Sequence, residues 1–176
     1  THFNGMWSFV LYDIDKNRLF GARDRFGVKP LYYLHNEKHF AFASEQKSLL
    51  EVPSYKPEVN LDAMLPFLLY GQVELQSEGF FKELYELKPA HFFLFDLTNN
   101  QLEQHSYFEL NGQQKNPSFN AVTFEEARKK TKELIKQAVR IRFRSDVPIG
   151  FCLSGGLDSS TIVCTAAQII KEESIS

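Results

Sequence analysis

Cysteine is scarce in this sequence, which holds only Cys152 and Cys164 among 176 residues. Two cysteines provide neither a disulfide framework nor the ligand spacing of a zinc site. Both lie in apolar segments, so we expect packed core residues in a reducing compartment and infer a cytoplasmic location. The five histidines also lack the spacing of metal ligands on a helix.

The sequence also has no large excess of positive or negative charge. Lys and Arg total 20 and Asp and Glu total 22, so the net charge is −2 and no nucleic-acid partner is indicated. No apolar run reaches the roughly 18 residues that a membrane span needs, so no membrane partner is expected. We expect no secretory leader. It starts at Thr1 without an initiator methionine, and we expect it to begin within a domain.

Several familiar motifs are absent. No lysine follows the paired glycines as in a Walker loop, and neither a dinucleotide fingerprint nor a Gly-x-Ser-x-Gly elbow occurs. The chain does contain the heptad SGGLDSS at Ser154–Ser160. It follows the apolar run Val147–Leu153, which predicts a buried strand of a parallel sheet. Apolar residues then recur at helical spacing to Ile170, so the pattern predicts a strand, a tight glycine turn and a helix.

That arrangement favours anion binding. The first N–H groups of a helix lack intrahelical partners and carry partial positive charge. Gly155 and Gly156 let a phosphate approach without a Cβ in the way. Ser154, Ser159 and Ser160 add hydroxyl donors, and Asp158 is suited to hold a magnesium ion shared with the phosphate. The alternative is an ordinary turn in which Asp158 or Ser159 only caps the helix.

The first 110 residues favour antiparallel strands. A short helical turn is expected at Glu45–Glu51. The charged segment Arg23-Asp24-Arg25 is interpreted first as an ion-pair cluster that fixes a loop, since structural ion pairs are commoner than catalytic ones. Aromatic and aliphatic runs joined by short polar turns predict three hairpins, Met6–Tyr12 with Arg18–Ala22, Leu31–His35 with His39–Ala43, and His91–Leu97 with Leu102–Phe108.

Helices are predicted at two further places. Asn60 is suited to cap a helix that runs to Tyr70 and closes at Gly71, and Pro66 within it predicts a kink or an early break. Asn111–Asn120 is polar and rich in turn residues, as a linker would be. After it, a capping box and an amphipathic pattern predict a long helix from Thr123 to about Phe143, with Thr123 and Glu126 as the capping pair.

The heptad resembles the pyrophosphate-binding loop of the ATP pyrophosphatases. Four segments in the same order resemble the glutamine-hydrolysing asparagine synthetases, namely Phe3–Asp13, Leu19–Tyr33, Phe42–Leu50 and Arg142–Ser160. The resemblance implies an α+β fold, a partial class II glutamine amidotransferase sandwich of mostly antiparallel strands, at residues 1–110. A linker at 111–122 and the first strand-loop-helix unit of an α/β ATP pyrophosphatase domain at 123–176 would follow. Ser44–Lys47 matches a family stretch near the passage of ammonia between the two domains.

The function implied is part of an enzyme that makes asparagine from aspartate, ATP and glutamine-derived ammonia through an aspartyl-adenylate. ATP and Mg²⁺ are the cofactors implied, with Asp158 as the metal ligand. The glutaminase nucleophile would precede Thr1, so we expect no catalytic residue for glutamine hydrolysis here and no activity of the isolated chain. A relative that adenylates another carboxylate, or a non-catalytic binding module, stays an alternative, and oligomeric state is open. The ATP and pyrophosphate residues would be Leu153, Ser154, Gly155, Gly156, Leu157, Asp158, Ser159 and Ser160.

Overall fold

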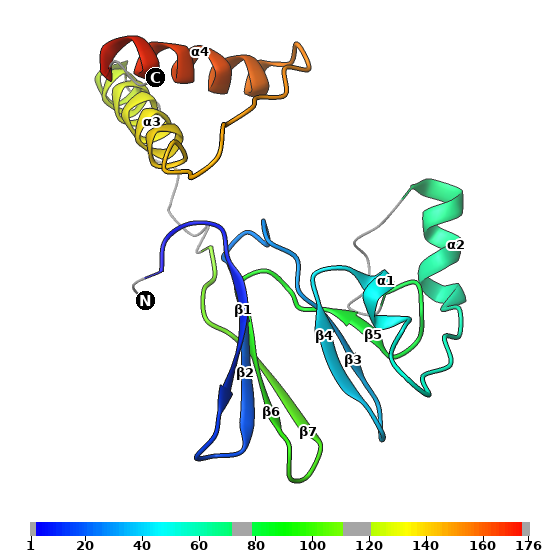
Figure 1. The fold of residues 1–176 in the computed structure, drawn as a ribbon. Helices are drawn as coiled ribbons and strands as arrows, with labels where there is room; N and C mark the ends of the chain where they lie inside the picture. Colours follow the sequence, from blue (N-terminus) through cyan, green and yellow to red (C-terminus); the bar gives the residue numbers. More distant parts are fainter. Residues whose placement is uncertain (1–2, 72–78, 111–120, 174–176) are drawn as a thin grey trace. The chain divides into compact units, whose positions relative to one another are not determined.

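The structure is a computed structural model that describes residues 3–71, 79–110 and 121–173 (Figure 1). The chain folds as two units, residues 1–112 and 113–176, and each is considered by itself. The predicted linker Asn111–Asn120 lies outside the described residues.

The first unit contains a four-stranded sheet with the order β1-β2-β6-β7. Neighbouring strands are antiparallel throughout. Two of the predicted hairpins, β1 with β2 and β6 with β7, are therefore confirmed. The strands are β1 Ser8–Asp13, β2 Arg18–Arg23, β6 His91–Asp96 and β7 Gln101–Ser106.

A second, three-stranded antiparallel sheet has the order β4-β3-β5. The hairpin of β3 (Tyr32–His35) and β4 (Phe40–Ala43) is as predicted, and α1 (Gln46–Leu49) follows it at the expected helical turn. β5 (Leu84–Glu86), which pairs with β3, was not predicted. A three-residue strand has too few positions to show alternation, and only its partner defines it.

The main core of this unit joins the two sheets. Phe93 and Phe95 of β6 pack with Tyr33 of β3, and Leu31 and Leu87 complete the buried cluster. Gly21 of β2 lies opposite Phe93, and an added Cβ there would stand 2.2 Å from the Phe93 ring. Only glycine leaves room for that ring, so Phe93 is buried completely.

A row of aromatic rings joins strands β1 and β2 to residues just outside the sheet. Trp7 stacks on Tyr107 with ring centroids 6.0 Å apart, and Phe3 and Phe9 lie 5.7 and 5.3 Å from Trp7. Phe9 in turn contacts Phe20 of the neighbouring strand at 6.0 Å. We call Phe3, Trp7, Phe9, Phe20 and Tyr107 the aromatic row.

α2 (Leu61–Tyr70) has the predicted caps. The Asn60 side chain accepts a hydrogen bond from the Asp62 N–H, and Gly71 adopts a left-handed φ of 68° while its N–H donates to Phe67 O. The early break expected at Pro66 is wrong, because the helix continues through it for a further turn. Pro66 removes only one backbone donor, and the two caps satisfy groups at both ends.

The second unit is a pair of helices, α3 (Ala121–Ile141) and α4 (Leu157–Glu173). Val139 of α3 packs against Ala166 and Ile169 of α4, as the amphipathic patterns indicate. The predicted capping box is wrong in position: α3 begins at Ala121, so Thr123 lies inside the helix instead of at its N-cap. No described helix is long and apolar enough to cross a lipid bilayer.

The predicted strand Val147–Leu153 is not formed in the described part of the second unit. Its residues form neither helix nor strand, and Val147 and Leu153 are 69% and 62% exposed. A parallel strand exists only when neighbours accept and donate its backbone hydrogen bonds, and none is described here. The prediction that Cys152 and Cys164 are core residues is wrong, since both are exposed free thiols.

Candidate functional site

The heptad Ser154–Ser160 forms the turn into α4, as predicted. Gly155 has a φ of 81°, in the left-handed region that favours glycine, and nothing lies within 4 Å of a Cβ placed on it. A Cβ on Gly156 would meet only Ser154 Oγ, at 3.6 Å. Leu153 and Leu157 flank the turn and are exposed. The backbone of the two glycines is therefore open to approach by a ligand.

Hydroxyl groups surround this turn. Ser154 Oγ and Ser159 Oγ are 3.0 Å apart, and the Ser159 hydroxyl donates to Gly156 O at 3.2 Å. The Ser160 N–H donates to Gly156 O at 3.1 Å, which is the first helical hydrogen bond of α4. The N–H groups of Leu157, Asp158 and Ser159 precede that bond, so they are the donors that a helix start leaves for a ligand.

Asp158 is the second residue of α4 and is exposed. No hydrogen bond or ion pair engages its carboxylate among the described residues. It therefore does not cap the helix in the described part of the chain. No group of three or more metal-ligating side chains occurs among the described residues. A single carboxylate still suits Mg²⁺, which binds through one or two carboxylates, waters and substrate phosphates.

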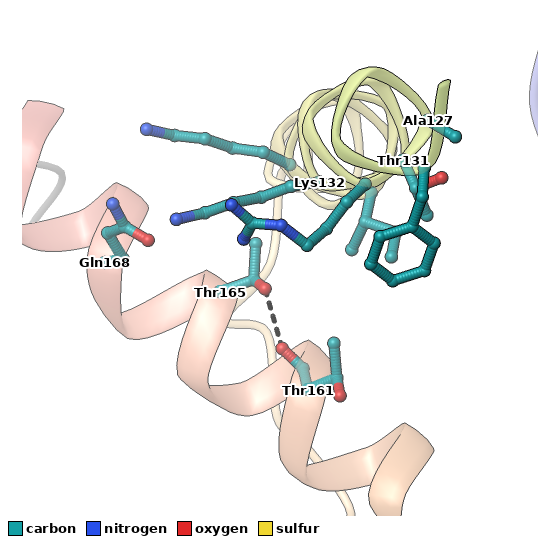
Figure 2. A pocket seen from close by; sticks show the side chains of 10 residues that line it. Ala127, Thr131, Lys132, Thr161, Thr165 and Gln168 are labelled. Atoms are coloured by element: carbon teal, nitrogen blue, oxygen red, sulfur yellow. Dashed lines mark hydrogen bonds between the residues drawn. The ribbon is translucent and has the colours of Figure 1, made fainter. Parts of the chain in front are cut away.

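A groove of about 430 Å³ lies between α3 and α4 (Figure 2). Basic side chains of α3, including Lys132, face Thr161, Thr165 and Gln168 of α4 across it. The hydroxyls of Thr161 and Thr165 donate to backbone carbonyls one turn earlier, each at 2.7 Å. Among the described residues the groove begins one residue beyond the heptad, so it does not contain the predicted loop.

Two of the groove's three cations are already paired. Arg128 pairs with Glu125 at 2.8 Å, and Lys136 pairs with Glu172 of α4. This pairing, with the Gln168 side chain, lowers the pKa of Glu172. The groove is thus explained by the packing of two amphipathic helices and their cross-links.

The charged segment of the first unit fixes a loop, as interpreted. Asp24 is 1% exposed, and its carboxylate accepts hydrogen bonds from the N–H groups of Trp7, Phe26, Val28 and Lys29 at 3.0–3.2 Å. Burial alone would raise the pKa of Asp24, but these four donors outweigh it and lower the pKa. Asp24 therefore organises the loop backbone and is not available as a reacting group.

Arg23 also stabilises this loop. It is buried, and it donates to the carbonyls of Gly27, Lys29 and Leu87 at 2.6–2.8 Å. Its ion pair is with Glu86 of β5 at 2.7 Å. The sequence indicated an ion-pair cluster, but most of the partners are backbone groups, which no residue pattern reveals.

The segment Ser44–Lys47 makes an internal ion pair and a contact with Gly79. Glu45 pairs with Lys47 at 2.6 Å, and the Gln46 side chain lies against Gly79. A role of this segment in the passage of ammonia stays a prediction.

The comparisons with known proteins divide the chain at a similar place. Residues 1–108 match the glutamine amidotransferase domain family, and residues 130–175 match the asparagine synthase family. Since the first match covers more than half of the chain, the chain belongs to the glutamine amidotransferase domain family.

Several of its relatives are asparagine synthetases. It is 39% identical to a putative glutamine-hydrolysing asparagine synthetase of Methanocaldococcus jannaschii, over 92% of this chain and 30% of the relative. It is 34% identical to a glutamine-hydrolysing asparagine synthetase of Bacillus subtilis, over 98% of this chain and 27% of the relative. An amidase of Gibberella zeae is 33% identical over 98% of this chain and 25% of the relative. The chain thus spans under a third of the length of these relatives and corresponds to an asparagine synthetase fragment.

Proposed function

We propose that this chain is part of an ATP-dependent amidotransferase that makes asparagine from aspartate with ammonia taken from glutamine. The observation that carries the proposal is the glycine turn at the start of α4, with Gly155 left-handed, within the segment that matches the asparagine synthase family. Residues 1–110 would be the later part of the glutaminase domain. Residues 123–176 would begin the synthetase domain, with 111–122 as the linker.

In this proposal the heptad receives the pyrophosphate end of ATP. The N–H groups of Leu157, Asp158 and Ser159 would donate to phosphate oxygens, assisted by the Ser154 and Ser160 hydroxyls. The aspartate substrate's carboxylate attacks the α-phosphorus of ATP, the bond to the β-phosphate oxygen breaks, and pyrophosphate leaves. Ammonia then displaces AMP from the acyl phosphate. The helix start stabilises the charge that grows on the departing pyrophosphate.

Asp158 would hold a magnesium ion on the same phosphates. The ion, when bound, neutralises charge on the pyrophosphate leaving group. The free carboxylate at the second position of α4, without a partner among the described residues, supports this assignment.

The loop assignment is tested in the full-length protein that carries this sequence. Asp158→Ala and Gly156→Val should each abolish pyrophosphate release from MgATP, aspartate and glutamine, while glutamine hydrolysis continues. The first change removes the metal ligand, and the second places a side chain where the phosphate approaches. Glu133→Ala, an exposed carboxylate of α3, is the control and should leave pyrophosphate release unchanged. Normal pyrophosphate release in either loop variant contradicts the assignment.

A second candidate acceptor is another carboxylate in place of aspartate. The amidase of Gibberella zeae, and a similar amidase of Penicillium rubens at 32% identity, favour this alternative, because relatives of this chain do not all share one name. Pyrophosphate release measured with aspartate and then with other carboxylic acids decides between the two.

We also propose that the 176-residue chain is inactive when isolated. Its two cysteines lie in the second unit, outside the match to the amidotransferase family, so neither is placed as the glutaminase nucleophile. The chain should release no glutamate from glutamine and should not bind MgATP at micromolar affinity in calorimetric titration. Glutamate release that disappears in Cys152→Ser or Cys164→Ser contradicts this. A cytoplasmic location stays a prediction, and a homo-oligomer is one of the oligomeric states left open.

A further inference from the structure

A pocket of about 360 Å³ opens between the two sheets of the first unit, beside the core cluster that contains Tyr33. Residues from β3, β5, β6 and β7 contribute to it, together with the segment before β6. It is lined by Tyr33, His35, Tyr85, Lys88, His91, Leu102 and Gln104. No carboxylate lines it among the described residues, so its polar groups are mainly hydrogen-bond donors or bases that accept a proton.

Tyr33 places a buried phenol at this pocket. The residue is 3% exposed, and its ring stacks on Tyr85 with centroids 5.2 Å apart. Gln104 Nε2 donates to Tyr33 Oη at 2.6 Å, so the phenol oxygen is the acceptor in that bond. Burial raises the pKa of Tyr33 to about 12, so the phenol stays protonated. No described residue accepts its hydrogen, which is available to a ligand that accepts hydrogen bonds.

A cationic side chain, Lys88, lines the same pocket. Lys88 is exposed and has no ion-pair partner among the described residues. His91 Nδ1 lies 2.8 Å from Pro89 O, and because a carbonyl only accepts, Nδ1 carries the hydrogen. His35 Nε2 is fixed in the same way on Asn100 O at 3.2 Å. A backbone carbonyl therefore holds each imidazole in place at the pocket.

We propose that this pocket binds a small oxyanion, a carboxylate or a phosphate, with the Tyr33 hydroxyl and the Lys88 ammonium as its direct donors. A buried neutral donor and an unpaired cation line one pocket, with no acidic residue in its lining among the described residues. This combination favours an anionic acceptor over a cation or an apolar ligand. The proposal concerns the first unit alone and is independent of the role proposed for the heptad.

The test uses the 176-residue chain and NMR titrations with inorganic phosphate and with malonate, each compared with sodium chloride at equal ionic strength. Saturable shifts of the His91, His35 and Gln104 signals at millimolar anion are expected. Phosphate and malonate separate the two chemical sources, and saturation by either one supports an oxyanion site. The absence of saturation with both anions, or equal shifts with chloride, overturns the proposal.

Two variants assign the donors. Tyr33→Phe removes only the hydroxyl and keeps the stacked ring, and Lys88→Gln removes the charge from a surface position. Each should weaken anion binding about tenfold, as expected for the loss of a hydrogen bond to a charged ligand. Lys38→Gln is the control, since Lys38 is an exposed lysine of the β3–β4 turn outside the pocket. Unchanged affinity in Lys88→Gln, or an equal loss in Lys38→Gln, overturns the proposal even if Tyr33→Phe does not fold.

Discussion

Gly21 and Phe93 face each other across β2 and β6, and no other residue fits where Gly21 stands. In Gly21→Ala the new Cβ would be 2.2 Å from the Phe93 ring, so the ring or the strand must move. We expect the first unit to lose about 1–3 kcal/mol of stability. Urea denaturation followed through the NMR signals of β2 and β6 measures the loss.

A double-mutant cycle identifies the cause. Phe93→Leu shortens the side chain that meets the new methyl group, so Gly21→Ala should cost less in that background than in the natural chain. Equal costs in both backgrounds would mean that the glycine is needed for another reason, such as strand conformation.

Asp24 makes the first unit sensitive to acid. Its pKa in the folded state is lowered, so it lies below the unfolded value of about 3.9. The stability that the carboxylate contributes is therefore complete above about pH 4 and is lost as the pH falls through the folded-state pKa. Urea midpoints measured by NMR across this range should decline in the natural chain.

Asp24→Asn should remove that decline and cost about 1–3 kcal/mol at neutral pH, because an amide cannot accept from all four N–H groups. Asp15→Asn, in the exposed β1–β2 turn, is the matched control and should preserve both the stability and the acid decline. An acid decline that persists unchanged in Asp24→Asn contradicts the assignment.

Among the elements, the contact between α3 and α4 offers a test with two neighbouring isoleucines. Ile169 is fully buried and packs against Val139, whereas Ile170 is 40% exposed. Ile169→Ala should destabilise the helix pair by about 2–5 kcal/mol through lost burial and the cavity left behind. Ile170→Ala should cost about 1 kcal/mol or less. Hydrogen exchange of the α4 amides measures both, and similar losses would contradict this packing.

The elements that could be predicted from sequence are those whose pattern is local. The three hairpins are built from apolar runs joined by short polar turns, and Asn60 and Gly71 are the residue types that cap a helix, so all were predicted. Pairing between strands that are distant in the sequence produces no local pattern of this kind. β5 is a strand because it pairs with β3. Val147–Leu153 forms no strand, and no strand pairs with it among the described residues. An apolar run has the same sequence pattern whether or not a partner strand lies beside it.

In the candidate site, too, only the features that depend on local residue types could be predicted. The glycine turn and the start of α4 follow from residue types, because Gly-Gly favours a left-handed turn and the apolar spacing after it is helical. The buried hydrogen bonds of Arg23 to three backbone carbonyls could not be predicted, since carbonyls belong to every residue. The pocket at Tyr33 was also missed, because its lining comes from four strands that only the fold brings together.

At the scale of the whole molecule, exposed apolar residues of the second unit favour self-association. Val147 and Leu153, which lie between the two helices, are exposed apolar side chains. Leu157, the first residue of α4, is exposed as well. We expect light scattering to show an average mass that rises with concentration. The double variant Val147→Ser/Leu153→Ser should reduce the rise. Ile14→Ser, which removes an equally exposed apolar residue from the first unit, should not. A constant monomer mass at all concentrations contradicts the prediction.

Trp7, in the aromatic row, is the single tryptophan of the sequence. Its indole stacks on Tyr107, and its backbone N–H and carbonyl both bond to Asp24, so its surroundings depend on the first unit being folded. The second unit has no indole of its own. Intrinsic tryptophan fluorescence of the intact chain is therefore an optical signal from the amidotransferase part alone, obtained without labelling or separating the two parts.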